Sequence, residues 1–508
     1  MEESRITENT AVVSEVKKTA DWKVAYIIGL AGTILVTGVA GPIVGGIGSF
    51  GWIEVLITVV FGVIYCFLLA ELAAMFPEKV GGLPTYAVEG FRDKKWGNIL
   101  GGFNNWAYFL GWSPVISVNT SLLAIYTAFL GGFSAQFYAG ILPIWPQGYL
   151  YIFAFTLGIT SLLYIVNYLG LQLGYRAALV FAAISLGPLL FLGFAPIFSG
   201  AMNWSNIFPI NTGITASATL NDWLFGIYPW FFIVTWNALA MEATASYLGE
   251  CKNPAKDAPK AMTAAAITGL VIYTSLPFAM LGVLGAGGVA LDPWAGFISV
   301  AAIYAGPMAS IIVGVMLWAA LLLSTTNALI GCARSLYQSS VEGLTISWLG
   351  KMNKYGSPAR AMLFGLIFNL MLVLVVAGLP TLIYVVSNVG YLFSFIPTGL
   401  AYWRLKRGYK GMPERTRPYS LPKIFGPLSM ICVIFFTIIW ITAGPLSPYS
   451  VYAIGGTALP PIFFWLLGVF ILALGIPMYI VGNKGYKKRI AEGTLTEAEK
   501  SIRETQKT

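Results

Sequence analysis

The chain has 508 residues, of which 57% are hydrophobic and 10% are charged, and its mean hydropathy is +0.76. Soluble domains contain about 45–50% apolar and about 25% charged residues. A chain this apolar cannot cover its surface in water, so lipid must be the solvent for most of its length. The absence of histidine excludes a Ser-His-Asp triad, a histidine proton relay and imidazole metal sites.

A membrane-spanning helix needs about 20 consecutive, mostly apolar residues. Twelve segments meet this requirement, at residues 24–47, 51–76, 98–131, 149–169, 176–199, 223–249, 261–286, 298–337, 360–378, 381–403, 426–444 and 459–482. We therefore predict an all-α integral membrane protein with twelve transmembrane helices.

The basic residues predict how these helices are oriented. All 30 lysines and arginines lie in the two tails, 1–23 and 484–508, or between the last turn of an even-numbered span and the first residue of the next span. By the positive-inside rule, both termini are expected in the cytoplasm. The net charge of +9 then reflects the basic residues on the cytoplasmic side, which also attract anionic lipid headgroups. We therefore do not expect nucleic acid as a partner.

The first span has an unusual middle. Glycines and Pro42 crowd it, next to Thr33 and Thr37. One interpretation is tight packing against another helix, for which small residues are used in membranes. The other is a discontinuous helix, whose free N–H groups would bind an anionic group and whose free carbonyls would bind a cation or ammonium.

The sixth span is the expected partner of the first. Thr235, Asn237 and Glu242 place polar groups in its middle. Five spans separate the two unusual helices, which is typical of two five-helix repeats of opposite topology with a binding site at the midplane. We predict repeats at 24–199 and 200–405, followed by helices eleven and twelve at 406–483.

Three glutamates lie within the predicted spans, where ionisable groups are candidate functional sites. Glu54 opens the second span and is expected at the outer interface. Glu71, near the inner end of that span, is expected to pair with inner-side arginine or backbone amides. For Glu242, a structural salt bridge and a proton-coupling role are equally good interpretations.

The eighth span contains Ser324, Thr325, Thr326 and Asn327 in a row. Hydroxyl oxygens at Ser324 and Thr325 are suitable ligands for a small hard cation such as Na⁺. The alternative is that these hydroxyls donate to carbonyls of their own helix.

Several stretches resemble the amino acid–polyamine–organocation (APC) family of secondary transporters, over about residues 25–425. They are Gly32–Val39 in the interrupted first helix, Glu71–Pro77 and Gly81–Tyr86 at the end of helix two, Gly102–Trp106 in helix three, Glu250–Ala261 after helix six, Asn327, Arg334, Tyr337, Gly343 and Ser357–Pro358 around the end of helix eight, and Arg417–Tyr419 before helix eleven.

The resemblance implies the LeuT-like fold, in which two inverted five-helix repeats and two further helices alternate access to a central site. It implies that amides at the first break hold a substrate carboxylate, while helix six holds the ammonium group and covers the side chain with an aromatic ring. By position, these roles fall on Thr33, Val36, Thr37 and Gly38, and on Trp236, Ala238 and Ala240.

The sequence departs from the family pattern at two of these positions and at Ser185. Val36 and Ala240 stand where glycine is usual, which narrows the pocket and favours a small substrate. Ser185 stands where many proton-coupled relatives have a lysine. Ser185 with Ser324–Thr326 leaves room for Na⁺, Glu242 is the alternative proton carrier, and exchange without an ion is a third possibility.

We therefore expect secondary active transport of an amino acid, most simply a neutral one, across the cell membrane. Polyamine or other organic-cation transport and a non-transporting sensor are the alternatives. The expected partners are the small-molecule substrate and the lipid bilayer, and no cofactor is expected beyond Na⁺ or H⁺ as coupling ion. The sequence has no Walker A motif that would couple it directly to ATP, and no enzymatic activity is expected.

Overall fold

The structure is a computed structural model that describes residues 20–77, 79–131, 147–169, 171–212, 219–291, 293, 296–375, 380–409, 412, 415–447, 453–454, 457–458, 460 and 462–505. Most of the predicted N-terminal tail, including the basic residues Arg5, Lys17 and Lys18, lies outside these residues. The described part is mainly helical, and its two strands of two residues each, Ala453–Ile454 (β1) and Thr457–Ala458 (β2), pair antiparallel.

The helices follow one another with short connections, and the label η marks 3-10 and π segments. They are α2 (Trp22–Thr33), η1 (Ile34–Gly38), α3 (Ala40–Met75), η2 (Leu83–Tyr86), η3 (Glu89–Phe91), α4 (Gly97–Trp112), α5 (Val115–Leu130), α7 (Gln147–Tyr168), α8 (Leu171–Ser199), η4 (Trp204–Asn206), α9 (Leu220–Asp222), η5 (Trp223–Ile227), α10 (Trp230–Ala238), η6 (Ala240–Glu250), α11 (Pro254–Leu291), α12 (Gly296–Ala305), α13 (Pro307–Val341), η7 (Ser347–Gly350), α14 (Ala359–Val375), α15 (Pro380–Arg407), α16 (Phe425–Ile438), η8 (Ile439–Ala443), η9 (Gly444–Leu446), α17 (Ile462–Ala473), α18 (Gly475–Glu492) and α19 (Glu497–Thr505).

The predicted twelve spans are confirmed, because every one corresponds to a helix. Ten helical segments of the described chain are long and apolar enough to cross a membrane, and the shorter helices Trp22–Gly38 and Ala359–Val375 complete the set. Helices are the expected solution, since lipid offers no hydrogen-bond partners to the backbone. The chain is a multi-pass membrane protein.

The first and second spans meet inside α3. Ile47 and Gly48 leave the helical conformation there, and Gly48 has a φ of +58°. A side chain at this position would be strained, which is why glycine suits the turn. The short piece 40–46 therefore continues the first span, and the long remainder of α3 forms the second.

The predicted eighth span, 298–337, is wrong at its beginning. The chain turns at Gly306, which has a φ of +79°, and separates α12 from α13. Ser310 Oγ donates to the carbonyl of Ile298 at 3.5 Å, so α12 folds back against α13 instead of extending it. In one continuous helix these two residues would lie about 18 Å apart.

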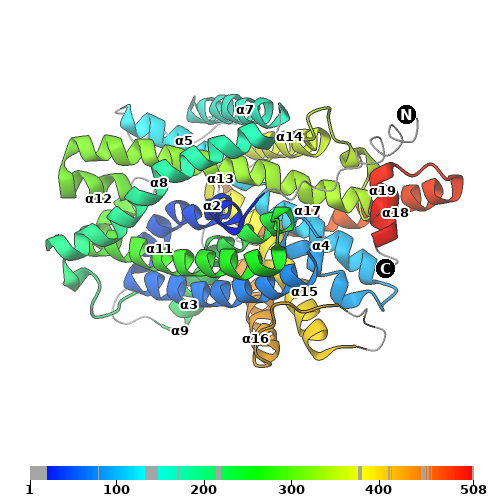
Figure 1. Cartoon of the computed structure of the whole chain (residues 1–508). Coiled ribbons are helices and arrows are strands. Elements are labelled where there is room, and N and C mark those ends of the chain that lie inside the picture. Colours follow the sequence, from blue (N-terminus) through cyan, green and yellow to red (C-terminus); the bar gives the residue numbers. More distant parts are fainter. Residues whose placement is uncertain are drawn as a thin grey trace.

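The two unusual spans lie together in the centre of the bundle. Helix α2 packs against η6, α8, α11 and α13, and it is surrounded by other helices in Figure 1. At their ends the two are tied through the backbone, because Ala20 N–H donates to Glu250 O at 3.2 Å and Lys252 N–H donates to Ala20 O at 2.9 Å. The two interrupted helices therefore lie next to each other, and other helices surround them.

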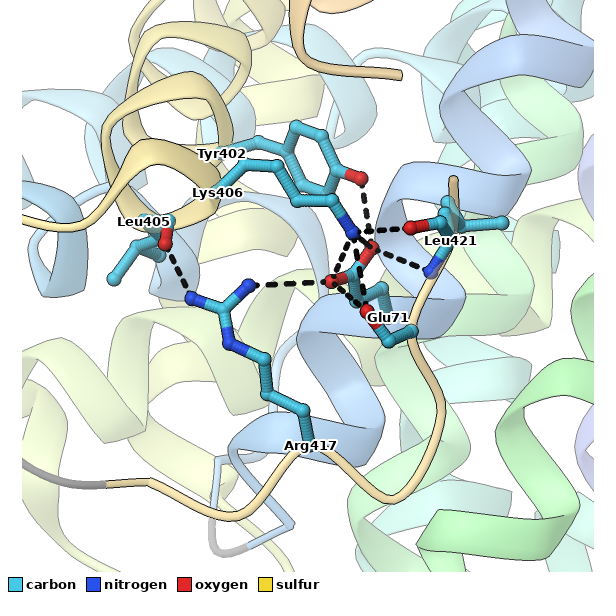
Figure 2. A network of polar contacts seen from close by, with 7 residues as sticks. Glu71, Tyr402, Leu405, Lys406, Arg417 and Leu421 are labelled. Atoms are coloured by element: carbon cyan, nitrogen blue, oxygen red, sulfur yellow. Dashed lines mark hydrogen bonds and ion pairs between the residues drawn. The ribbon is translucent and has the colours of Figure 1, made fainter. Parts of the chain in front are cut away.

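One end of the bundle holds the buried ion pairs of the described residues, and we call it the ion-paired end. Glu71 lies near the end of α3 here, and its carboxylate is 2.8 Å from Lys406 Nζ on α15. Tyr402 and the Leu421 N–H also donate to Glu71, at 2.7 and 3.1 Å, and Arg417 lies at 3.4 Å (Figure 2). The expected structural role of Glu71 is confirmed, with a lysine as its main cation.

A second cluster at the ion-paired end centres on Lys79. Its ammonium lies 3.0 Å from Glu89 and 3.1 Å from Glu342, which joins the segment after α3 to the end of α13. Burial would lower the pKa of Lys79, but the two carboxylates raise it above its ordinary value. Burial would raise the pKa of Glu89, but Lys79 and Arg92 lower it to about 2.

The segment predicted as a C-terminal tail is helical in its described part. Residue 484 lies within α18, and α19 follows at Glu497–Thr505. Arg489 on α18 pairs with Glu499 on α19 at 2.5 Å, and α19 packs on α13. Both helices lie at the right-hand end of the bundle in Figure 1.

Candidate functional site

The α-helical winding stops at corresponding places in the first and sixth spans. Helix α2 ends at Thr33 and continues as the 3-10 segment η1, and α10 ends at Ala238 before the 3-10 segment η6 begins at Ala240. Runs of 3-10 helix longer than three or four residues are uncommon and often mark functional hinges. The interruptions expected from the sequence therefore take the form of tighter winding, not of an extended segment.

The two interrupted segments are in direct contact, and glycine makes this possible. A Cβ atom on Gly32 would lie 1.8 Å from the Ala240 carbonyl oxygen, and one on Gly29 would lie 2.0 Å from Thr244 Oγ1. No side chain fits at either position without movement of the opposite backbone. The glycines of the first span thus serve both interpretations, since they allow close packing and bring the two interruptions together.

Side chains from other helices bind the carbonyls that the change of winding exposes. The Tyr273 hydroxyl donates to Gly32 O at 2.8 Å, and the Tyr384 hydroxyl donates to Gly38 O at 2.8 Å. The Asn237 amide donates to Leu35 O. These bonds satisfy buried backbone groups that would otherwise be costly, and each is a bond that a substrate's polar group could replace.

The four site residues predicted in the first span are all buried around η1. Thr37 Oγ1 donates to Ile34 O at 3.2 Å, whereas the Thr33 hydroxyl has no hydrogen-bond partner among the described residues. The Tyr384 hydroxyl packs directly on Gly38, because a Cβ atom at this position would lie 2.5 Å from it. Val36, which stands in the place of the usual glycine, is 2% exposed.

The residues predicted in the sixth span lie on the other side of the contact. Trp236 is buried, donates from Nε1 to Gly111 O at 3.3 Å, and places its ring 4.6 Å from that of Tyr384. Ala238 and Ala240 flank the point where α10 changes into η6. We call these two interruptions, with Glu242, the central site.

Glu242 is fully buried and is held by neutral donors. Trp112 Nε1 donates to its carboxylate at 2.8 Å, Tyr391 at 3.1 Å and Tyr108 at 3.2 Å. None of the ion pairs found within the described ranges involves Glu242. The interpretation as a structural salt bridge is therefore wrong for this conformation, and an ionised Glu242 would be a membrane charge without a counter-ion.

The hydroxyl groups predicted for a cation lie on α8 and α13, which pack against each other. Thr325 and Thr326 donate to Leu321 O and Leu322 O, at 2.7 and 2.8 Å, as in the alternative interpretation. Ser185 Oγ makes a long bond of 3.4 Å to Ala182 O. Ser324 Oγ is buried without a hydrogen-bond partner in the described structure, so its oxygen is available to a ligand.

The aromatic donors at the central site were not assigned by sequence reasoning. Tyr108 and Trp112 come from α4, Tyr273 from α11, and Tyr384 and Tyr391 from α15. Each is a polar aromatic residue inside a predicted span, and that is the only signal the sequence offers. Nothing in their spacing tells which of the chain's 26 tyrosines converge on the same carboxylate.

A multi-pass helical bundle with paired interruptions at its centre is the architecture of a membrane transporter. The family model described as amino acid permease matches residues 11–472. The chain belongs to this amino acid permease family. It is a transporter and not an enzyme.

Individual relatives are distant and differ in their substrates. The branched-chain amino acid permease BcaP of Bacillus subtilis (strain 168) is 23% identical over 66% of this chain and 72% of its own. The polyamine transporter PUT1 of Oryza sativa subsp. japonica is 25% identical over 76% and 65%, respectively. The serine/threonine exchanger SteT of B. subtilis is 25% identical over 43% of each chain.

Proposed function

We propose that this protein is a secondary active transporter of a small neutral amino acid, which it carries across the cell membrane by alternating access. Both termini lie in the cytoplasm in this proposal, as the distribution of lysine and arginine indicates. The observation that carries it is the buried contact between the end of α2 and the start of η6, at which the two helices both change their winding. Two relatives named for amino acids support the same substrate class.

The substrate carboxylate would bind backbone N–H groups near Thr33 to Gly38, since N–H groups at the end of a helix attract anions. The ammonium group would bind carbonyls around Ala238 and Ala240. Trp236 would cover the side chain. The methyl groups of Val36 and Ala240 restrict the space, which favours a small substrate.

For coupling, we propose that Glu242 carries a proton. Protonation removes a charge that has no counter-ion in the described structure, and the three neutral donors can also bond to the carbonyl oxygen of the protonated acid. The alternative is Na⁺ bound near Ser324 and Thr325, for which the unpartnered Ser324 oxygen is the supporting feature. Ser185 and Thr326 would complete that site.

Uptake of a pool of labelled amino acids into proteoliposomes tests these proposals. The protein is reconstituted with a proton gradient, a Na⁺ gradient, neither gradient, or unlabelled amino acid inside. We expect uptake with the proton gradient, and we expect Glu242→Gln to abolish it. Dependence on Na⁺ would move the coupling role to Ser324, and uptake only into preloaded vesicles would show exchange. No uptake in any condition would contradict the amino-acid assignment.

A second candidate function is transport of an amine or polyamine. The supporting observation is the same buried carboxylate, because Glu242 with Trp112, Tyr108 and Tyr391 combines a negative charge with aromatic rings, and both attract organic cations. One relative is named as a polyamine transporter. Labelled putrescine in the same vesicles distinguishes the candidates, because a diamine carrier would accumulate it while neutral amino acids would not compete.

A further inference from the structure

Glu54 differs from the other two glutamates of the membrane spans. It lies in α3, it is 0% exposed, and neither of its carboxylate oxygens has a hydrogen-bond partner among the described residues. Glu71 on the same helix binds Lys406, and Glu242 accepts bonds from three donors. Glu54 is therefore enclosed by protein, and nothing among the described residues stabilises a charge on its carboxylate.

The face of α3 that carries Glu54 leads to the central site. Glu54, Thr58 and Gly62 are spaced four residues apart and share one face of the helix. A Cβ atom on Gly62 would lie 2.9 Å from the Ala238 carbonyl oxygen, so this face meets α10 where its winding changes. Eight residues separate Glu54 from Gly62, which is about 12 Å along the helix axis.

Glu54 lies on the side of Gly62 that is farther from the ion-paired end. Trp230, at the start of α10, packs close to Gly46, so α10 runs beside α3 from this region down to Ala238. Thr58 is the nearest polar residue on the face, and its hydroxyl donates to the Glu54 backbone carbonyl at 2.9 Å instead of to the carboxylate. Glu54 thus lies on α3 between two places, near Gly46 and near Gly62, at which this helix packs on α10.

No titratable group on a neighbouring element compensates Glu54. The elements packed against α3 are α10, α11, α15, α16, η1 and η6. Their titratable groups are Lys256, Asp257, Lys260 and Tyr273 on α11; Tyr384, Tyr391, Tyr402, Arg404, Lys406 and Arg407 on α15; Cys432 on α16; and Glu242, Tyr247 and Glu250 on η6. None of them is hydrogen-bonded or ion-paired to Glu54 within the described structure.

We propose that Glu54 is a proton-binding site that is protonated while α10 packs on α3 and releases its proton when the two helices separate. The physical reason is that a carboxylate without a counter-ion is unstable inside a membrane, whereas the neutral acid is tolerated. Opening of the bundle admits water, which stabilises the ionised form. This proposal rests on the proposed alternating-access transport. It adds a second proton site to Glu242, and this second site lies toward the end of α3 that is opposite the ion-paired end.

Infrared spectroscopy of the purified full-length protein tests the protonation state without any substrate. The C=O stretch of a protonated carboxyl group is separate from the bands of a carboxylate. At pH 7, Glu54→Gln should lose intensity from the protonated band. The matched control Glu492→Gln, at a residue that is 50% exposed, should lose carboxylate bands instead. Loss of carboxylate bands in Glu54→Gln would overturn the proposal.

Transport then tests whether the proton moves. Proton-driven uptake by the wild type should depend on the external pH, Glu54→Gln should lose that dependence, and Glu54→Asp should retain it. Wild-type pH dependence in Glu54→Gln would overturn the release step. The infrared measurement is independent of uptake, so a wild type that takes up no amino acid would contradict the proposed function while the protonation of Glu54 stood.

Discussion

The ion-paired end and the central site differ in the partners of their buried carboxylates. At the ion-paired end, Glu71 has the Lys406 ammonium at 2.8 Å, the Arg417 guanidinium at 3.4 Å, and further donors from Tyr402 and Leu421. At the central site, Glu242 has only neutral donors, from two tyrosines and a tryptophan. A carboxylate that is paired with a cation holds neighbouring helices in place. A buried carboxylate without such a partner is stabilised when it binds a proton or a cation. The difference separates structural charges from functional ones.

The largest effect is expected from removing the cation of the Glu71 cluster. Lys406→Met leaves a buried carboxylate without its main partner, which is expected to cost about 3–5 kcal/mol of stability. Thermal unfolding of the purified protein, followed by tryptophan fluorescence, measures the loss. Lys423→Met is the matched control, because Lys423 is exposed and should be replaceable without effect.

A double variant shows whether the charge or the packing matters in this cluster. Glu71→Leu combined with Lys406→Met removes both charges, and such replacements of buried pairs are often neutral or stabilising. We expect most of the stability lost in Lys406→Met to return. If the double variant were as unstable as the single one, Glu71 would act through its contacts to Tyr402 and Leu421 and not through its charge.

The pH dependence of stability should reveal the second cluster. Glu89 has a pKa of about 2, below its ordinary value of 4.5, so it stabilises the folded protein above pH 4.5. That contribution, about 3 kcal/mol, is lost as the pH falls from about 5 toward 2. Unfolding temperatures measured across this range should fall less steeply in Glu89→Gln than in the wild type. Equal slopes would contradict a pKa lowered by Lys79 and Arg92.

An intermediate effect is expected at the contact between the interrupted helices. Gly32→Ala places a methyl group against the Ala240 carbonyl, and overpacking of this kind costs about 1–3 kcal/mol. Uptake should fall together with the unfolding temperature, because the two segments cannot approach. Gly158→Ala is the matched control in α7, since nothing lies within 4 Å of its added Cβ atom. Normal uptake by Gly32→Ala would mean that the contact is not needed for transport.

The sequence predicted the bundle well because lipid imposes a simple rule on the chain. All twelve apolar segments are mainly helical, and the glycine-rich middle of the first span marked the real change of winding. The fold-back at Gly306 was missed because α12 is apolar enough to read as part of α13. The pair Gly306–Pro307 was the available signal, since such a pair marks turns.

The central site could be predicted only in part. Positions such as Thr33 and Ala240 were assigned through the resemblance to the APC family, which places them where their own helices are interrupted. The donors to Glu242 are 130 to 149 residues away from it in the chain, so their convergence is a property of tertiary packing. The enclosure of Glu54 is of the same kind, because an interfacial and a buried glutamate near a helix start look alike in one sequence.

Glu242→Gln should have the smallest effect on stability and so provides the sharpest contrast with Lys406→Met. Glutamine keeps the shape of the acid and an oxygen that accepts from Trp112 or a tyrosine, so the expected change is about 1 kcal/mol or less. Uptake driven by a proton gradient should nevertheless be lost, while the unfolding temperature stays close to that of the control Glu492→Gln. A large loss of stability would place Glu242 with the structural carboxylates of the ion-paired end. Full proton-driven uptake would leave Glu54 as the remaining membrane carboxylate without a counter-charge in the described structure.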